Sequence, residues 1–437
     1  MRNLLTTLFF FTLFVCNAQE LTSEQIDSKT YNSFTNKDFN TTIQLGNQAI
    51  KQGIDYYFLR YRIGVSYFEK TNYEAAIPHF EKAKEFDSKD PVMLEYLYYS
   101  YIYTNRIEKA TVLLGILPED LKTKLNHRSP IFESISAEIG ILTTNNFDTF
   151  KNSNLRGTNN YAHGKFYSDV VFGNIVINNK ITPNFKLQNL LSLVTNTSND
   201  LFQSSLGAGR SQIFTNKNNY FQWNAIGSYY VKGWSISAGF GMYNSSYITY
   251  TPPLPFPPNA PFTSIKTNST NFSTSFSLSK KLEYIEPSLA ITYSDLSNTN
   301  TLSIEGALNY FPLGNLNFYG STKFGIVTND SETNTIITQS LGLKLSKKIW
   351  IEGYGAYGNH QNYISENGLF VFNTPNKINW YGGSNLNFYF NNLDMSLGYG
   401  TQERASSYEK GANPANTNTT NYTYNYNLIK TKIVWKF

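Results

Sequence analysis

Hydrophobic and polar residues alternate one by one through the C-terminal two thirds of the chain, from Ile131 onwards. One such run has Trp234, Ile236, Ala238, Phe240 and Met242 separated by serine and glycine. The same alternation recurs in 272–278, 302–309, 316–326 and 378–390, where Phe318, Phe388, Trp380 and Ile378 take the apolar phase. Segments of about ten residues with this period of two are typical of strands that have one face towards lipid and one towards a polar interior.

Fourteen strands are expected from this alternation if short turns join the strands at one end and longer loops join them at the other. Their expected positions are 132–145, 165–180, 185–197, 219–231, 234–248, 269–282 and 286–297, followed by strands that begin near 301, 316, 335, 349, 378, 395 and 421. The expected short turns lie at 182–184, 232–233, 313–315, 347–348 and 391–392. Twelve and sixteen strands remain alternatives to this count of fourteen.

The last expected strand has an apolar face that includes Ile433, Trp435 and Phe437, with Lys430, Lys432 and Lys436 on the other face. A terminal phenylalanine that closes an alternating strand resembles the signal by which the outer-membrane assembly machinery selects barrels. We therefore expect Ile433, Trp435 and Phe437 to form a barrel assembly signal. Tyr422, Tyr424 and Tyr426 are out of phase with this face, so we expect a bulge or a loop extension there.

Residues 22–127 have a different period, of 34 residues, and a helical pattern within it. The copy at 57–90 carries Ile63, Gly64, Tyr67, Tyr73, Ala76, Phe80 and Ala83. The copy that follows carries Leu97, Tyr101, Ile107, Ala110 and Leu117, and Phe39 and Ala49 mark a degenerate copy before them. These positions resemble the tetratricopeptide repeat, in which stacked helical hairpins bury a shared core.

That resemblance implies a concave groove for a protein partner, lined by the first helix of each repeat. Carried over by position, the groove residues are Phe58, Tyr61, Phe68, Tyr99 and Tyr103. The alternative for each of them is a place in the core between repeats. With about three copies, the resemblance implies a docking site and not a long scaffold.

The first eighteen residues are expected to be a signal peptide. Arg2 precedes an apolar run from Leu4 to Val15, and Ala18 offers a small residue at the cleavage site. Cys16 is the only cysteine, so cleavage leaves a mature chain without disulfides, cysteine catalysis or thiolate metal sites. The expected fold class is α+β multidomain, with a tetratricopeptide-like periplasmic domain at 19–128 and an antiparallel outer-membrane β-barrel at 129–437.

Composition agrees with a barrel. Aromatic residues make up 16% of the chain and charged residues 15%, while the mean hydropathy is −0.36. Residues 126–437 hold 22 Lys+Arg and 16 Asp+Glu, a net charge of +6, against −1 for residues 1–125 with 14 and 15. The positive charges form no cluster, so outer-membrane lipid is an expected partner and nucleic acid is not.

No catalytic, cofactor-binding or metal-binding motif stands out, so we expect no enzyme, no cofactor and no metal. The four histidines are His79, His127, His163 and His360, of which the last two are expected near the outer rim. The segment from Thr251 to Phe262 holds six of the chain's fifteen prolines, which indicates a stiff surface loop or a lid.

Two functions from different classes remain open. The first is an accessory subunit of a secretion or outer-membrane assembly machine, whose barrel anchors it and whose helices recruit a periplasmic partner through residues 22–127. The second is a passive or export channel for a polysaccharide or small solute. The layout is similar to that of repeat-bearing exopolysaccharide export porins, although those carry many more repeats.

Overall fold

A computed structural model describes residues 22–125, 130–144, 149–150, 153–205, 209–253, 261–296, 299–329, 332–365, 370–372, 374 and 376–437. The chain separates into two compact units, one ending at Tyr101 and the other running from Ile102 to Phe437. The expected signal peptide, His127 and most of the proline-rich loop lie outside the described residues. The expected domain boundary after residue 128 stays a prediction.

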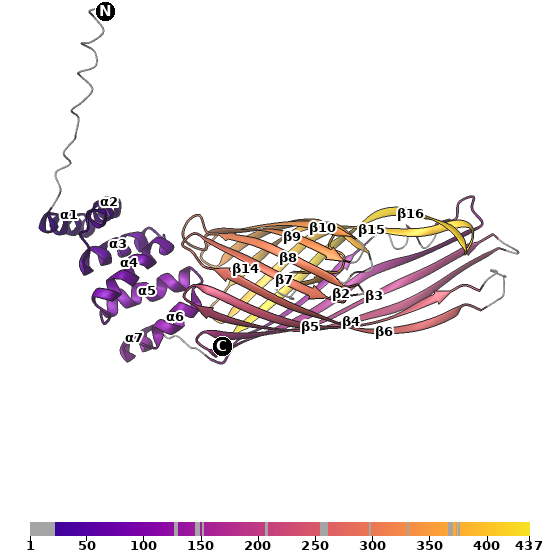
Figure 1. Cartoon of the computed structure of the whole chain (residues 1–437), viewed down its shortest axis with the longest axis horizontal. Helices are drawn as coiled ribbons and strands as arrows, with labels where there is room; N and C mark the ends of the chain where they lie inside the picture. Colours follow the sequence, from indigo (N-terminus) through magenta and orange to yellow (C-terminus); the bar gives the residue numbers. More distant parts are fainter. Residues whose placement is uncertain are drawn as a thin grey trace, which may run out of the picture. The chain divides into compact units, whose positions relative to one another are not determined.

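Seven helices precede the first strand in the described part of the chain (Figure 1). They are α1 (Ser23–Thr35), α2 (Phe39–Lys51), α3 (Tyr57–Glu69), α4 (Tyr73–Phe86), α5 (Pro91–Tyr103), α6 (Ile107–Leu114) and α7 (Glu119–Leu125). Side-chain caps set where several of them begin: Thr22 and Gln25 form a reciprocal capping box at α1, and Asn72 accepts from the Ala75 amide at α4. Among the described residues, none of the helices is long and apolar enough to cross a membrane.

Helices α3 and α4 share a closely packed apolar core. Ile63, Ala76 and Phe80 are fully buried, and a Cβ atom at Gly64 would lie 2.7 Å from the Phe80 ring. Position 64 therefore needs glycine, because a closely packed interior leaves no room for even one methyl group. Most positions quoted for the repeat are buried as the pattern predicts, whereas Phe39, Tyr67, Tyr73 and Ile107 are partly exposed. The tetratricopeptide character itself stays a prediction.

Fourteen antiparallel strands form a closed barrel among the described residues, which confirms the strand number counted from the alternation. The strands are β1 (Phe132–Thr143), β2 (Tyr161–Thr182), β3 (Phe185–Ser204), β4 (Arg210–Val231), β5 (Trp234–Thr251), β6 (Thr263–Lys280), β7 (Ile285–Ser294), β8 (Thr301–Tyr310), β9 (Phe318–Asn329), β10 (Thr333–Lys344), β11 (Ile349–Gly358), β14 (Lys377–Tyr389), β15 (Leu393–Asn413) and β16 (Asn416–Lys436). Each of them is hydrogen-bonded to the next in this order. β11 pairs with β14, and β16 closes the barrel on β1. The hairpin β12 (Tyr363–Ser365) and β13 (Phe370–Phe372) forms a separate small sheet.

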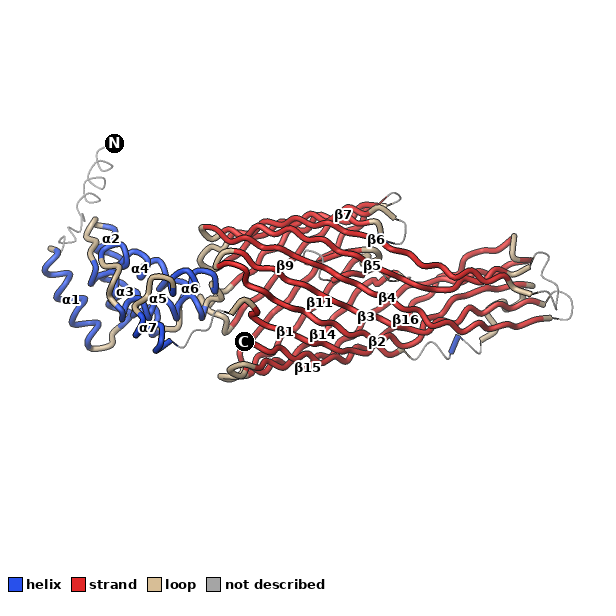
Figure 2. The backbone as a smooth tube through the Cα atoms, turned by 90° about the horizontal axis from the view of Figure 1, so that it is seen from below, coloured by secondary structure: helices blue, strands red, loops and turns tan. Residues whose placement is uncertain are grey.

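The two ends of the barrel differ, and we call them the short-turn end and the long-loop end. At the short-turn end, Lys232 and Gly233 join β4 to β5 with φ of 48° and 78°, the geometry that matches strand twist in a two-residue hairpin. At the long-loop end, strands such as β2, with 22 residues, extend well beyond β7, with 10 (Figure 2). In this extension β15 pairs directly with β2, between Tyr408 and Gly411 on one strand and Gly164 and Tyr161 on the other.

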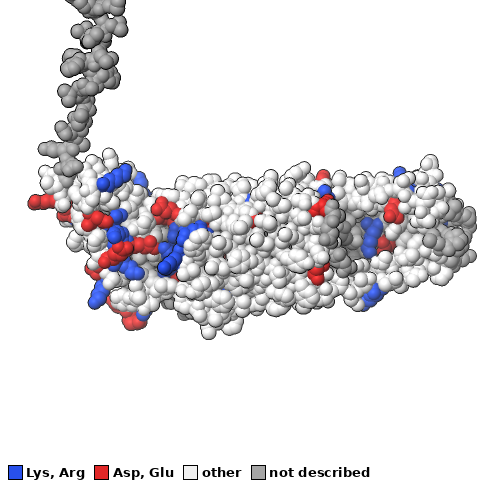
Figure 3. Space-filling view, viewed as in Figure 1, with Lys and Arg blue, Asp and Glu red and all other residues white. Residues whose placement is uncertain are grey.

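The outer surface of the barrel is apolar. Leu193, Leu289 and Phe324 are 65%, 51% and 49% exposed, and the visible face of the barrel has a broad zone without charged side chains (Figure 3). Each of the fourteen described strands is paired with a neighbour on both sides, which a lipid environment requires of the membrane-spanning part. The fold is thus that of an outer-membrane β-barrel, and it places the protein in the outer membrane.

One outward-facing assignment is wrong. The alternation predicts Ile378 on the apolar outer face with Trp380, but Ile378 is 1% exposed. The pairing of β14 with β15 shifts register between Ile378 and Trp380, so the alternation breaks at that point. A register slip by one residue moves a side chain to the other face of a sheet.

Within the second unit, α6 contacts the short-turn end. The Arg106 guanidinium donates to the Leu282 carbonyl at 2.8 Å, and the Lys186 ammonium lies 3.4 Å from the Glu108 carboxylate. Lys186 also lies 3.2 Å from Glu133 at the start of β1. These polar contacts tie α6 to the turns of the barrel.

Candidate functional site

The inner wall of the barrel is built from hydroxyl and amide side chains. On β4, β5 and β6 the inward positions bring Asn224, Tyr243 and Ser273 together, and the Tyr243 hydroxyl lies 2.9 Å from the Asn224 amide nitrogen and 2.8 Å from the Ser273 hydroxyl. Tyr243 itself is 5% exposed. The alternation predicts that this face is polar, and the structure confirms it.

A hairpin from the loop between β11 and β14 packs against this inner wall. β12 and β13 form a two-stranded sheet whose two faces contact different strands of the barrel. Ile364 packs against Tyr243 and Leu296, while Tyr363 packs against Val327 of β9 and Ile336 of β10. The positions 243, 327 and 336 all lie on the inward faces of their strands, so the hairpin lies inside the lumen.

A carboxylate on β8 holds this hairpin. The hydroxyls of Tyr363 and Ser365 both donate to one carboxylate oxygen of Glu305, the latter at 2.9 Å. Hydrogen bonds to a charged acceptor are stronger than those between neutral groups. Glu305 therefore forms a clasp for β12, and we call this group of three residues the Glu305 clasp.

His360 fixes the base of the same hairpin. It is fully buried, its Nδ1 lies 3.2 Å from the Ile378 carbonyl, and its ring lies 5.3 Å from Phe372 and 5.0 Å from Tyr381. His163, at the long-loop end of β2, stacks on Phe202 with ring centroids 4.1 Å apart and lies 3.7 Å from the Asp200 carboxylate. Both histidines lie towards the long-loop end, as expected from the sequence.

Of the two alternatives expected near Tyr422, Tyr424 and Tyr426, the bulge is absent and the extension is present: β16 runs back to Asn416, beyond its last pair with β1 at Asn427. β15 and β16 pair without a register shift from Trp435 to Thr417. Tyr424 and Tyr426 are 6% and 0% exposed and pack with Val170, so they lie on the inner face with Lys430. Their phase opposite to Trp435 follows from regular alternation, because residues at even and odd positions face opposite sides of the barrel.

Several charged side chains on the inner face are paired with opposite charges. Lys430 lies 3.6 Å from Glu138, and Lys436 lies 2.7 Å from Asp394. In the extension, Lys165 lies 3.7 Å from Asp200. Within the described residues, no group of three or more histidine, cysteine, aspartate and glutamate side chains could hold a metal ion.

The predicted groove residues of the helices fall into two groups. Tyr61 and Phe68 make edge-to-face contacts with Tyr96 of α5, at centroid distances of 6.3 and 4.9 Å. These two side chains thus contribute to packing between helices. Phe58 is 59% exposed and Tyr103 42% exposed, while Tyr99 is half-buried beside Tyr98.

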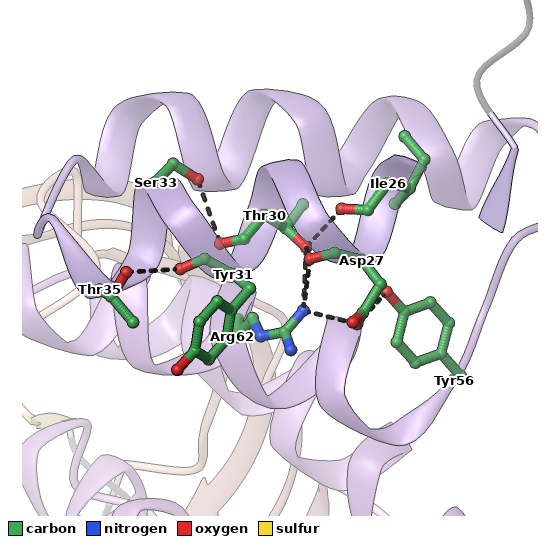
Figure 4. A network of polar contacts seen from close by, with 8 residues as sticks. All are labelled: Ile26, Asp27, Thr30, Tyr31, Ser33, Thr35, Tyr56 and Arg62. Carbon is green, nitrogen blue, oxygen red and sulfur yellow. Dashed lines mark hydrogen bonds and ion pairs between the residues drawn. The ribbon is translucent and has the colours of Figure 1, made fainter. Parts of the chain in front are cut away.

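Next to Phe58, Arg62 ties α3 to α1 (Figure 4). Its Nη1 atom donates to the Asp27 carboxylate at 2.8 Å and to the Thr30 hydroxyl at 3.0 Å. The Arg62 guanidinium also lies 5.3 Å from the centre of the exposed Tyr31 ring. Burial acts to raise the pKa of Asp27, but hydrogen bonds from Arg62 and Tyr56 outweigh it and hold that pKa below its ordinary value.

A second polar group lies between α3 and α4. Arg60 forms two hydrogen bonds with Asp55, at 2.7 and 2.8 Å, and these lower the pKa of Asp55. The same guanidinium lies 3.3 Å from Nδ1 of His79, whose ring stacks on Tyr67. Burial and the Arg60 charge lower the pKa of His79 to about 4, so the ring is neutral at physiological pH.

The predicted assembly-signal residues lie on the outer face of the last strand. Ile433, Trp435 and Phe437 are 44%, 52% and 48% exposed, and Ile433 and Trp435 are paired with Ala137 and Ile135 of β1. They lie beside the closing seam of the barrel. Their role as a signal stays a prediction.

Sequence reasoning missed the Glu305 clasp and the hairpin it holds. The alternation places Glu305 correctly on the polar face of its strand, but Tyr363 lies 58 residues further along the chain. The sequence did contain one signal for the contact, which is the Glu305 carboxylate in the middle of a membrane strand. A charge at that depth requires a partner.

The chain is similar to solved outer-membrane proteins in fold. It matches the toluene transporter TodX of P. putida with a TM-score of 0.46 and 7% identity, over 71% of this chain and 91% of that chain. It matches a FadL homologue of Pseudomonas aeruginosa with a TM-score of 0.43 and 9% identity, over 70% and 90%. A bacterial polysaccharide outer membrane secretin gives a TM-score of 0.35 and 8% identity, over 71% and 100%.

No protein-family model matches the sequence, and no curated protein is significantly similar to it. The similar structures share a barrel with this chain at scores too low to transfer a function. The function is therefore inferred from the residues of this chain.

Proposed function

We propose that this protein is an outer-membrane channel for small, uncharged, hydrophilic solutes, closed in this conformation by the hairpin β12–β13. The observation that carries the proposal is the Glu305 clasp, in which two hydroxyl groups hold a loop segment against the inner wall beside the apolar contacts of Ile364 and Tyr363. The hydroxyl contacts can exchange for water or for solute hydroxyls. Because β12 and β13 form a sheet of their own, the hairpin can leave the lumen without any change in the strand pairing of the barrel wall.

The number of strands supports a water-filled lumen, which the hairpin would close. Eight strands enclose an interior that wall side chains can fill, whereas sixteen leave an aqueous channel. A barrel of fourteen strands is closer to the second case. A barrel that served only as an anchor would have no need of a removable segment inside it.

The chemistry of the inner wall favours the passage of uncharged solutes. The ion pairs Lys430–Glu138 and Lys436–Asp394 leave each of these side chains with a neutralising partner. Hydroxyls and amides such as those of Ser273 and Asn224 offer both donors and acceptors. A wall of this kind replaces the hydration of a hydroxylated solute without attracting ions of one sign.

The test is permeability of liposomes that contain the purified full-length protein. Glu305→Ala should raise the swelling rate in uncharged sugars several-fold, because it releases both hydroxyls of β12. Glu286→Ala is the matched control: Glu286 is an acidic residue near the short-turn end that accepts from Ser279 at 3.1 Å and does not touch the hairpin. If neither the native protein nor the Glu305 variant admits a solute, the channel proposal fails.

The helices support a second function, the binding of a periplasmic protein, as in an accessory subunit of a secretion or assembly machine. The supporting observation is Phe58, a large ring 59% exposed beside the Arg62 guanidinium. Exposed aromatic rings are frequent anchors in protein interfaces. Phe58→Ala should reduce the proteins recovered with the full-length chain from outer membranes, and an unchanged set would argue against docking at this position.

A further inference from the structure

Five side chains gather on the inner face at the short-turn end, away from the hairpin. They come from β9, β11 and β14 and are Tyr319, Trp350, Glu352, Asn387 and Tyr389. These side chains point inward. Ile351, which lies between Trp350 and Glu352 on β11, is 38% exposed on the outer face, so its two neighbours face the lumen. Asn387 is 8% exposed. The channel function proposed above leaves this cluster without a role.

The carboxylate at the centre of the cluster is held in one orientation. One oxygen of Glu352 accepts from the Tyr319 hydroxyl, and the other accepts from the Asn387 amide at 2.9 Å. A carboxylate oxygen can accept two hydrogen bonds. Each oxygen of Glu352 therefore keeps capacity for one more donor, at a position fixed in advance.

Two aromatic rings form a corner beside this carboxylate. The Trp350 and Tyr389 centroids are 4.9 Å apart with planes at 80°. Trp350 is fixed in place, because its indole N–H donates to the Leu316 carbonyl at 3.0 Å. The Lys344 ammonium lies 4.9 Å from the Trp350 ring and adds a donor at the same end of the lumen.

These groups together match a sugar ring, which has an apolar C–H face and a rim of hydroxyls. The aromatic rings suit the C–H face, while Glu352 and Asn387 accept from hydroxyls and Lys344 donates to them. An apolar solute would desolvate Glu352 without giving it a donor, which is costly. A small anion would face the carboxylate itself.

We propose that this cluster is a saccharide-binding subsite for neutral sugars at the short-turn end of the lumen. The proposal rests on the channel function for its place on a solute route, but the binding it predicts can be measured without transport. Glu352 and Asn387 act as hydroxyl acceptors, and Trp350 and Tyr389 supply the stacking surface. Tyr319 positions the carboxylate.

The experiment is titration calorimetry of the full-length protein in a detergent without a sugar headgroup, with glucose, N-acetylglucosamine and maltotriose as probes. At least one sugar should bind saturably. Glu352→Gln should weaken that binding about tenfold, the effect of losing roughly 1.4 kcal/mol of charge-assisted hydrogen bonding. Trp350→Leu should weaken it by a similar factor.

Two controls separate the subsite from a general effect. Trp223→Leu removes an outward-facing tryptophan on β4, and Glu286→Gln alters an acidic residue outside the cluster, so both should leave the affinity unchanged. Gel mobility before and after heating confirms that each variant has a folded barrel. Absence of binding by all three sugars, or equal affinity in Glu352→Gln and the native protein, would overturn the subsite.

Failure of the subsite and failure of the channel give different results. Binding that depends on Glu352, together with liposomes that admit no solute, removes the channel and keeps the subsite. Liposomes that admit sugars at the same rate with the native protein and with the Glu352→Gln variant, without measurable binding, keep the channel and remove the subsite.

Discussion

Adjacent residues of one strand have opposite surroundings in this barrel, and β7 allows a direct comparison. Leu289 is 51% exposed on the outer face, whereas Ala290 faces inward and is paired with Glu305 of β8. Leu289→Arg should lower the free energy of unfolding by about 2–4 kcal/mol near the bilayer midplane. Ala290→Arg should cost less, because the new cation lies opposite a carboxylate.

The measurement is denaturant unfolding in lipid vesicles, followed by gel mobility. Equal losses in the two variants would show that the assigned inward and outward faces of β7 are wrong. A larger loss for Ala290→Arg would show the same.

His79 makes the stability of the helices depend on pH. Its pKa is about 4 in the folded chain against 6.5 when unperturbed, since burial and the Arg60 charge disfavour the protonated ring. As pH falls below 6.5 the unfolded chain takes up a proton that the folded chain does not, so stability is lost between pH 6.5 and about 4. The full effect is on the order of 3 kcal/mol.

His79→Gln should flatten this dependence, measured by the helical circular-dichroism signal during thermal unfolding of the full-length protein across that pH range. His163→Gln is the matched control, because His163 belongs to the barrel, and it should leave the slope unchanged. A slope for His79→Gln that equals the native slope would contradict the assignment of the pH dependence to His79.

At the residue level, the sequence predicts the inner and outer faces wherever alternation is regular. Tyr424 and Tyr426 show how this information can be misread: both have the same parity as Lys430, which the alternation assigns to the inner face. Treating the tyrosines as displaced outer residues requires a bulge, whereas their parity requires none. Ile378 is different, since the register shift beside it depends on how β14 meets β15 in space.

Arg62 links helices α1 and α3 by hydrogen bonds, beside apolar contacts such as that of Phe34 with Tyr61, and its contribution can be tested. The Arg62 side chain is 9% exposed and bonds both Asp27 and Thr30 of α1. Arg62→Met keeps the apolar part of the side chain and removes these bonds. The loss should be about 1–2 kcal/mol, because the Asp27 carboxylate and the Thr30 hydroxyl each lose one hydrogen bond.

Hydrogen exchange should then become faster in α1 and stay slow in α3 and α4, which have their own core. Lys82→Met is the control: it breaks the Lys82–Glu85 pair, whose side chains are 40% and 66% exposed, and such surface pairs contribute at most about 1 kcal/mol. Unchanged exchange in α1 of Arg62→Met would contradict the role given to this arginine.

At the level of elements, the fourteen strands could be predicted because each one must satisfy the same demand, an apolar face towards lipid. Outside the lipid that demand ends, which is why the sequence did not predict the full length of β2, which begins at Tyr161, or of β16, which begins at Asn416. The hairpin β12–β13 has only three residues in each strand and depends on Glu305, a contact made after the loop folds inward. Local pattern contains no information on such a contact.

For the whole molecule, the division into two compact units decides which part can be removed. The unit that ends at Tyr101 has its own buried core around Leu59 and Ile63, and the barrel is closed by the pairing of β1 with β16. Removing residues 22–101 leaves α6 with its contacts to Leu282 and Lys186. The remaining chain should insert as a barrel that still shifts in gel mobility on heating.

The same deletion separates the two proposed functions. If the helices bind a periplasmic protein, that protein should be lost from purified outer-membrane complexes when residues 22–101 are absent, because the exposed Phe58 ring goes with them. Liposomes that contain the shortened chain should keep the effect of Glu305→Ala on sugar permeability, because the clasp lies wholly within the second unit. Identical co-purified proteins with and without residues 22–101 would contradict docking by this unit, while loss of the Glu305→Ala effect would show that closure of the lumen also requires the first unit.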